Sequence, residues 1–185
     1  MLSYDKKRLG IYIHIPFCVS KCAYCDFNSA PPQNPEIVQR YISAVIAHME
    51  SYRDAGSSYE PDTVFIGGGT PTTLTAPQLE RLLTQVEQCF DLSRLTEYTV
   101  EAGRPDTITA DKLAVLKAHH VDRVSVNPQS MEDTVLEAMG RSHTAADILD
   151  AYAIVRQSGI PMVNMDLIAG LPKDSLEGFQ YTLEQ

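Results

Sequence analysis

The chain has 185 residues, of which 44% are hydrophobic, and this is room for one domain with a sizeable core. Its formal net charge is −9, and no run of Lys and Arg interrupts that acidity, so we do not expect a nucleic-acid interface. We recognise no secretory signal and no apolar run of membrane length. Four cysteines in such a chain indicate metal ligands or reactive thiols, and we expect a cytoplasmic protein.

Five strand segments, each followed by a helical pattern, are predicted along the chain. The strands are expected at residues 11–15, 63–66, 98–102, 123–126 and 162–168. The helices are expected from Pro35 to about Asp54 with a stop at Gly56, from Thr75, over 110–119, beyond Ser130, from Thr144 to Gly159, and from Ser175. Strict alternation predicts a parallel α/β sheet with crossover helices, and leaves open whether it is a doubly wound sheet or a barrel.

Apolar residues at helical spacing mark the helix faces that we expect to be buried. The predicted stripe of the first helix is Ile37, Tyr41, Val45 and Met49, and that of the second is Leu79, Leu82, Leu83, Val86 and Phe90. Cys89 lies on the same side of the second helix and is interpreted as a small core residue. Met131, Met139, Met162 and Met165 are likewise interpreted as packing residues.

Three cysteines follow the first predicted strand with the spacing Cys-x3-Cys-x2-Cys, at Cys18, Cys22 and Cys25. Thiolates at this spacing can converge on a soft metal centre, and they select zinc, copper(I) or an iron–sulfur cluster. A zinc site with His14 as the fourth ligand is one alternative, since three cysteines and one histidine form a known zinc set. A cluster of four irons with three protein ligands would keep one iron open to a substrate or cofactor.

Other polar residues and glycines follow the predicted strands, where parallel α/β folds gather their chemistry. The residues concerned are Tyr12, His14, the run Gly67-Gly68-Gly69, Glu101, Asn127, Gln129 and Asp166. A glycine run between a strand and a helix is either a plain tight turn or a place where bare backbone approaches a ligand. Because five strand ends carry such residues toward one rim, we predict a site there.

The cysteine motif, with Tyr24 before its last cysteine, resembles the signature of radical S-adenosylmethionine (SAM) enzymes. Further motifs are similar to those of the oxygen-independent coproporphyrinogen III oxidases and their related haem chaperones: YIHIPFC at 12–18, CDFN at 25–28, GGGTP at 67–71, VEAGRPD at 100–106, NPQS at 127–130 and MDLIAGLP at 165–172. The resemblance implies a partial (β/α)6 TIM-like barrel. We expect residues 1–185 to be its core domain, truncated after about five βα units, without the sixth unit and the C-terminal domain.

The same resemblance implies a [4Fe-4S] cluster on Cys18, Cys22 and Cys25 and a bound SAM. It assigns SAM contacts to Tyr12, Tyr24, Gly68, Gly69, Thr70, Glu101, Gln129, Arg141 and Asp166. Among these, Arg141 would pair with the SAM carboxylate and Asp166 would accept hydrogen bonds from ribose hydroxyls. An electron donor and a porphyrinogen or haem are the further implied partners.

Two functions remain open within that family. Oxidases of the family carry a further cysteine two residues after the motif, whereas this chain has Phe27, as the haem chaperones do. VEAGRPD and NPQS instead resemble a branch of coproporphyrinogen dehydrogenases. The sequence therefore favours a haem chaperone only slightly over a redox enzyme that converts propionate side chains to vinyl groups. A third alternative is an inactive fragment that exposes one sheet edge.

Overall fold

The computed structural model describes residues 7–53 and 58–185, and it has a parallel sheet of five strands in the order β1-β2-β3-β4-β5. The strands are β1 (Lys7–Ile15), β2 (Tyr59–Gly68), β3 (Glu97–Glu101), β4 (Arg123–Ser125) and β5 (Met162–Asn164). The helices are α1 (Pro35–Ser51), α2 (Ala76–Cys89), α3 (Ala110–Ala118), α4 (Asp133–Ala138), α5 (Ala145–Gln157) and α6 (Leu176–Glu184), with short 3-10 turns η2 (Pro71–Thr73) and η3 (Pro105–Thr107). The predicted α/β alternation is confirmed, and the architecture is a partial TIM-like barrel.

Local sequence signals begin the helices where they were expected. Asn34 Oδ1 accepts a hydrogen bond from the Ile37 N–H at 2.9 Å, which caps α1. Gln78 Oε1 accepts from the Thr75 N–H at 2.9 Å, and Asp147 forms the matching box with Thr144 in α5. The predicted stop of α1 at Gly56 lies outside the described residues.

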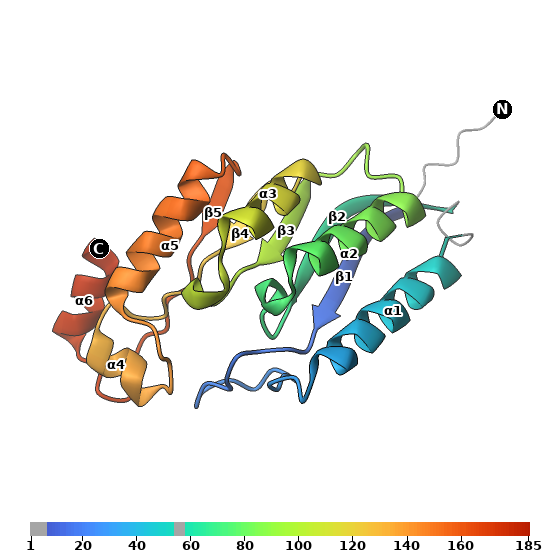
Figure 1. The fold of residues 1–185 in the computed structure, drawn as a ribbon. Coiled ribbons are helices and arrows are strands. Elements are labelled where there is room, and N and C mark those ends of the chain that lie inside the picture. The colour runs from blue at the N-terminus through green and yellow to red at the C-terminus, as the bar shows by residue number, and fades with distance from the viewer. Residues whose placement is uncertain (1–6, 54–57) are drawn as a thin grey trace.

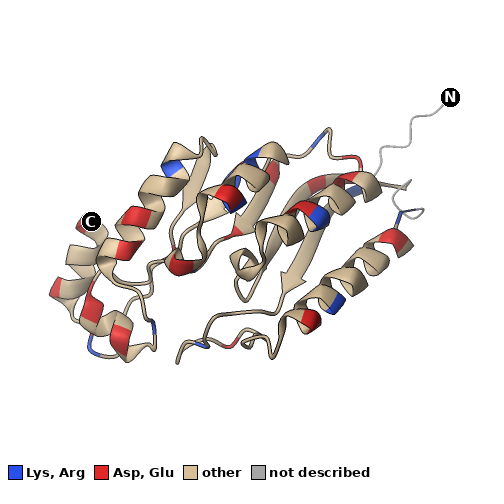
Figure 2. Cartoon of the chain, in the orientation of Figure 1, with Lys and Arg blue, Asp and Glu red and all other residues tan. Residues whose placement is uncertain are grey.

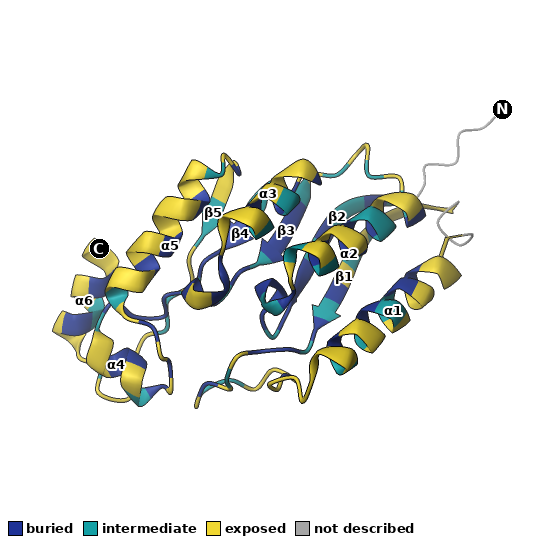
Figure 3. Ribbon diagram, viewed as in Figure 1, coloured by how far each residue is buried: buried dark blue, intermediate teal, exposed yellow. Residues whose placement is uncertain are grey.

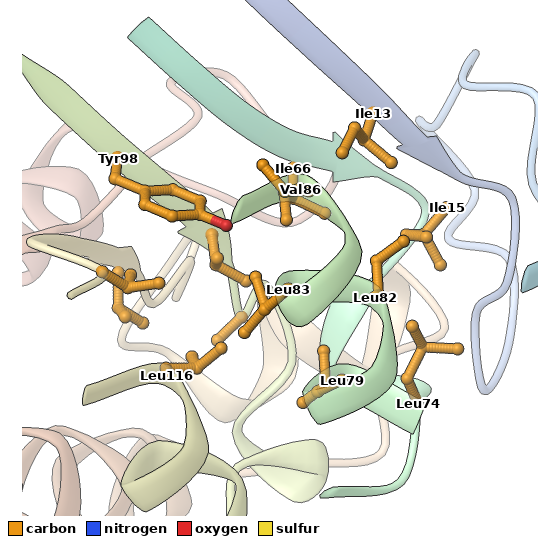
Figure 4. Close-up of a cluster of buried hydrophobic side chains, with 14 of the residues drawn as sticks. Ile13, Ile15, Ile66, Leu74, Leu79, Leu82, Leu83, Val86, Tyr98 and Leu116 are labelled. Carbon is orange, nitrogen blue, oxygen red and sulfur yellow. The ribbon is translucent and has the colours of Figure 1, made fainter. Parts of the chain in front are cut away.

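Helices α1, α2, α3 and α5 cover one face of the sheet (Figure 1). Strand residues that point to this face are buried, and Figure 4 shows their side chains meeting α2 and α3. The core includes Ile13, Ile15, Val64, Ile66, Tyr98, Val100, Leu79, Leu82, Leu83, Val86 and Leu116. Burying one such leucine stabilises the fold by about 1.5–3 kcal/mol relative to leaving it exposed. Outer helix faces are exposed and carry mixed charges (Figures 2 and 3).

The opposite face of the sheet carries the alternate residues of each strand, in rows set by the register. One row runs Tyr12, Phe65, Thr99, Arg123 and Met162 across all five strands. The next row, one step nearer the strand ends, begins at His14 and Gly67 and continues with Ser125 beside Glu101. Because strand side chains alternate, these residues point away from the helices and toward the barrel interior.

Several details differ from the sequence prediction. β1 begins at Lys7, because pairing with β2 extends it, and β2 accommodates Pro61 at a register shift. β5 ends at Asn164 and continues only as an isolated bridge between Gln129 and Leu167. Of the predicted stripe of α1, only Met49 lies on the most buried face, with Val38, Ile42 and Ile46, while Ile37, Tyr41 and Val45 pack partly buried against the core.

Two of the four methionines are not packing residues: Met162 and Met165 are 45% and 40% exposed. Both lie on or just after β5, which is an edge strand of the sheet that the described residues form. Met131 and Met139 are buried, as expected. Cys89 is also buried in the main core, which confirms its interpretation. Of the helices described, none is both long and apolar enough to cross a membrane.

Candidate functional site

The candidate site lies at the C-terminal ends of the strands, where the loop after β1 meets the loop after β2 (Figure 1). Backbone hydrogen bonds join the two loops: the Gly69 N–H donates to Ile15 O at 2.8 Å, and the Thr70 N–H donates to Phe17 O at 2.7 Å. Within the first loop, the Cys18 N–H donates to Ala30 O at 3.2 Å. The cysteine loop is therefore fixed to the sheet at both ends.

All three predicted cluster cysteines line one cavity of about 100 Å³ at this junction. Cys18 and Cys22 are buried and Cys25 is partly buried. Cys18 Sγ lies 3.2 Å from Thr70 Oγ1. Across the described ranges, no three His, Cys, Asp or Glu side chains form a group that could hold one metal ion. A cubane cluster does not require its protein ligands to converge on one metal ion, because each cysteine thiolate ligates a different iron.

His14, the alternative zinc ligand, is engaged elsewhere. One ring nitrogen, Nδ1, is 2.9 Å from the Tyr12 hydroxyl, and the other, Nε2, is 3.0 Å from Asn28 O. Both nitrogens thus have protein partners, and His14 connects β1 to the end of the cysteine loop.

Seven of the nine predicted SAM contacts line the same cavity as the cysteines. They are Tyr24, Gly68, Gly69, Thr70, Glu101, Gln129 and Arg141. The structure does not bring Tyr12 and Asp166 into the cavity lining. Tyr12 is 57% exposed on the barrel-facing side of β1, one step behind the strand end. Asp166 is exposed, accepts from Asn164 Nδ2 at 2.8 Å, and its carbonyl accepts the Gln129 N–H at 3.0 Å.

The glycine loop is shaped by its protein neighbours. Gly68 has φ +112°, a conformation that L side chains rarely adopt, and a Cβ there would meet the His14 ring at 2.5 Å. A Cβ at Gly69 would meet Phe17 O at 2.5 Å. The N–H groups of both glycines and of Thr70 already donate within the protein. An ammonium group of a ligand is itself a donor, so at this loop it would pair with acceptors such as the backbone carbonyls or the Glu101 carboxylate.

Glu101 anchors the glycine loop from the end of β3. Its Oε2 accepts the Gly68 N–H at 3.0 Å. Burial raises the pKa of Glu101 above its ordinary value, and the nearby Asp166 carboxylate raises it further, while the Gly68 hydrogen bond opposes that shift.

Arg141 and Tyr24 come together from segments 117 residues apart. Arg141 Nη2 donates to the Tyr24 hydroxyl at 2.8 Å, and Nη1 donates to Asn127 O at 2.7 Å. Burial raises the pKa of Tyr24 to about 12, although the guanidinium acts in the opposite direction. Tyr24 is therefore a neutral phenol that accepts from a buried cation.

Sequence reasoning missed several residues that line the cavity, above all Arg104. Its side chain is 2% exposed, and its Nη2 lies 2.7 Å from Ser20 O and 3.4 Å from Cys22 Sγ. Arg104 stands in the motif VEAGRPD, but its role depends on a loop 84 residues earlier in the chain. The remaining missed lining residues are Ser20, Lys21, Ser29 and Gly103, whereas Asn127, predicted at the rim, and Phe27, noted after the cysteine motif, also line the cavity.

Unpartnered buried polar atoms concentrate around this cavity. Among the described residues, seven buried side-chain N or O atoms have no hydrogen-bond partner, and five belong to residues that line it. These five atoms are Ser29 Oγ, Arg104 Nη1, Asn127 Oδ1, Gln129 Oε1 and Arg141 Nε. Gln129 also has φ +68°, which is uncommon for a residue with a side chain. Because unpaired buried polar groups are costly, this cavity is suited to a polar ligand.

Comparison with known proteins gives a consistent picture. The profile of the radical SAM superfamily matches residues 12–185. The oxygen-independent coproporphyrinogen-III oxidase-like protein HemZ of Bacillus subtilis is 40% identical over 184 residues, which cover 97% of this chain and 37% of HemZ. Heme chaperone HemW of the same organism is 38% identical, covering 93% of this chain and 45% of HemW. The chain thus spans less than half the length of these curated relatives.

Among solved structures, coproporphyrinogen III oxidase (HemN) from Escherichia coli, described as a radical SAM enzyme, superposes with a TM-score of 0.87. It is 28% identical and covers 98% of this chain and 42% of HemN. The radical SAM methyltransferase TsrM from Kitasatospora setae shares the fold alone, with a TM-score of 0.64 at 19% identity, over 95% of this chain and 33% of TsrM. The chain therefore belongs to the radical SAM superfamily, in the group of oxygen-independent coproporphyrinogen III oxidases and related haem chaperones.

Proposed function

We propose that the protein binds a [4Fe-4S] cluster through Cys18, Cys22 and Cys25 and holds SAM beside it. The observation that carries this proposal is that the three cysteines share one cavity with seven of the nine residues matched to SAM contacts. The donor set fits a cluster, because thiolates are its usual ligands. The unpartnered polar atoms of Gln129, Asn127 and Arg141 fit a polar cofactor. When bound, the cluster and SAM supply reductive cleavage of SAM and hence radical chemistry.

The chain's own residues would bind and orient these groups. Arg141 has its Nε without a protein partner, while its other nitrogens are held by Tyr24 and Asn127, so Nε is free to donate to the SAM carboxylate. Carbonyls of the glycine loop would accept from the amino group, because an ammonium group is a hydrogen-bond donor. Asp166, exposed beside the cavity, and Tyr12, farther along the sheet face, would be reached by the outer part of SAM.

We propose that this chemistry serves haem or porphyrin metabolism, with a haem chaperone as the favoured role. Phe27 lines the cavity and is 59% exposed, at the position where the family's oxidases have a further cysteine. A phenyl ring there narrows the space beside the cluster, whereas an oxidase must bring its substrate within about 3–3.5 Å of the reacting atom. The similarity to proteins named heme chaperone HemW supports this role.

The second candidate is an oxygen-independent coproporphyrinogen dehydrogenase. The 40% identity to a protein named as oxidase-like favours it, and so do the motifs VEAGRPD and NPQS. Under either role, we propose that residues 1–185 form part of the radical SAM core domain and that the protein works in the cytoplasm with an electron donor.

One titration tests the SAM site that both candidates share, and two further assays separate the candidates. The reconstituted protein is first titrated with SAM, and binding is followed through the electron paramagnetic signal of the reduced cluster. It is then given reductant, SAM, an electron acceptor and coproporphyrinogen III, beside a separate titration with haem. Haem binding and transfer to an acceptor without protoporphyrinogen formation support the chaperone role. Multiple turnovers to protoporphyrinogen IX and carbon dioxide support the dehydrogenase and contradict the chaperone.

A further inference from the structure

Arg104 is a buried cation that lines the cavity. It is not among the residues matched to the family's SAM contacts. Its guanidinium lies against the cysteine loop: Nη2 is 2.7 Å from Ser20 O, 2.8 Å from Ser20 Oγ and 3.4 Å from Cys22 Sγ. Its Nη1 is buried without a hydrogen-bond partner. Because arginine stays protonated in proteins, this side chain is a fixed positive charge next to one of the proposed cluster ligands.

The backbone of Arg104 is held independently of its side chain. Arg104 O accepts from the Thr107 N–H at 3.1 Å and from Thr107 Oγ1 at 2.8 Å. Thr107 Oγ1 also lies 2.6 Å from Thr72 Oγ1, and Lys112 Nζ donates to the carbonyls of both threonines. The turn that begins at Arg104 is therefore held by hydrogen bonds that do not involve the guanidinium. A substitution of the Arg104 side chain should leave the backbone of this turn in place.

No carboxylate of the described residues forms an ion pair with Arg104. Within residues 7–53 and 58–185, no Asp or Glu lies in ion-pair distance of Arg104. The same holds for Arg141 in that part of the chain. A buried charge without a counter-ion is expensive, so such a group is typically retained where an anion binds. Among the hydrogen-bond partners of the Arg104 side chain, the one that becomes anionic on metal binding is the Cys22 sulfur.

We propose that Arg104 is a positioning residue that holds Cys22 and raises the reduction potential of the cluster, an inference that rests on the proposed cluster. A hydrogen bond to a ligand sulfur and a nearby positive charge both stabilise the reduced form, which carries one more negative charge. The cluster gains one electron from an external reductant, and no bond to Arg104 forms or breaks. The Nη1 atom, buried without a protein partner, would remain available as a donor.

The test measures the midpoint potential of the reconstituted cluster by titration with dithionite, followed by electron paramagnetic resonance. Arg104→Gln removes the charge and should make reduction at least tenfold less favourable, which is about 59 mV more negative for a one-electron couple. Arg104→Lys keeps the positive charge on a shorter side chain, so the midpoint potential of its cluster should lie between those of the parent and Arg104→Gln. Arg94→Gln is the matched control, because it removes the same charge from a side chain that is 76% exposed and paired with Glu60.

Equal potentials in the parent and Arg104→Gln, with equal iron content, would overturn the proposal. If Arg104→Gln does not hold iron, a midpoint potential of Arg104→Lys that is equal to or higher than that of the parent would also overturn the proposal. Loss of the cluster from both variants would make Arg104 a structural anchor of the loop and would also refute tuning. Failure of the parent chain itself to bind iron and sulfide refutes the proposed function instead, and this outcome is visible before any variant is made.

Discussion

The Nη2 atom of Arg141 lies 2.8 Å from the hydroxyl oxygen of Tyr24, which joins the cysteine loop to the segment after α4. The guanidinium carbon is also 6.0 Å from the centre of the Tyr24 ring. Through this contact, two residues that are far apart in sequence lie side by side in the lining of the cavity. It also fixes the orientation of a buried guanidinium whose Nε remains unpartnered.

Arg141→Lys should weaken SAM binding while the cluster is retained. A hydrogen bond to a charged group is worth about 1.5–3 kcal/mol, so we expect affinity to fall by about tenfold to a hundredfold. Tyr24→Phe, which removes only the acceptor, should cost a few-fold. Isothermal titration with SAM measures both, and Arg156→Lys on the exposed side of α5 is the control. Unchanged affinity in Arg141→Lys would remove Arg141 from the SAM site.

Replacement of any one of Cys18, Cys22 and Cys25 by Ala should abolish the brown colour of the anaerobically reconstituted protein. The parent should hold about four irons and four sulfides, as a single cubane requires. Cys89→Ala should keep the full content, because Cys89 is packed in the core and its Sγ accepts from Gln85 Nε2 at 3.2 Å. Iron and sulfide analysis is the measurement. Stoichiometric zinc in a colourless parent would favour the zinc alternative.

Most of the fold was predictable because strand–helix alternation and helix caps are local signals. The stripe of α1 was misjudged for a tertiary reason. Tyr41, Val45 and Met49 line an apolar groove beside β1, so they contact the edge of the sheet as well as its face. Val38, Ile42 and Ile46 point at the core, and Met49 belongs to both faces because it is buried in the core as well. Periodicity alone does not separate two adjacent apolar faces of one helix.

The candidate site was predictable where a motif carries it and not where a distant contact does. Cys18 and Gln129 follow strand ends and Gly68 is the last residue of β2, so topology alone brings them to one rim. Arg104 also follows a strand end, but only the folded cysteine loop shows that its charge faces Cys22. The reason for glycine at position 68 differs as well, because the His14 ring occupies the space that a side chain would need.

Because of His143, the free energy of unfolding should be lower in mild acid than at neutral pH. Burial, followed by the charges of Arg141 and Arg104, lowers the pKa of His143 from 6.5 to about 4. Between these values the unfolded chain binds a proton that the folded chain does not, so the free energy of unfolding falls as the pH drops from about 6.5 toward 4.

The matched variant for this effect is His143→Gln, which does not titrate and can still accept from Arg141 Nη1. Urea unfolding of both proteins at pH 7 and pH 5 isolates the histidine, because the carboxylates titrate equally in both. The parent should lose more stability than the variant over this interval. Equal losses would mean that His143 is protonated in the folded protein.

Gly68→Ala should destabilise the protein more than Gly140→Ala, although both glycines have positive φ. At Gly140, with φ +73°, a Cβ would meet nothing within 4 Å, so the cost is the backbone conformation alone, about 1–2 kcal/mol. At Gly68 the same kind of cost is joined by the clash with His14 and by strain on the Gly68 N–H bond to Glu101. Urea unfolding of each variant gives the two losses.

A double-mutant cycle with His14→Ala separates the clash from the backbone term, because removing the ring frees the space that the new Cβ needs. We expect Gly68→Ala to cost less in the His14→Ala background than in the parent. SAM affinity should follow the same pattern, since the loop that carries Gly69 and Thr70 would return toward its position. Two outcomes would contradict this explanation: equal losses of unfolding free energy in the two glycine variants, or an unchanged loss for Gly68→Ala in the His14→Ala background. Either would mean that position 68 requires glycine for its backbone conformation alone and not because of the His14 ring.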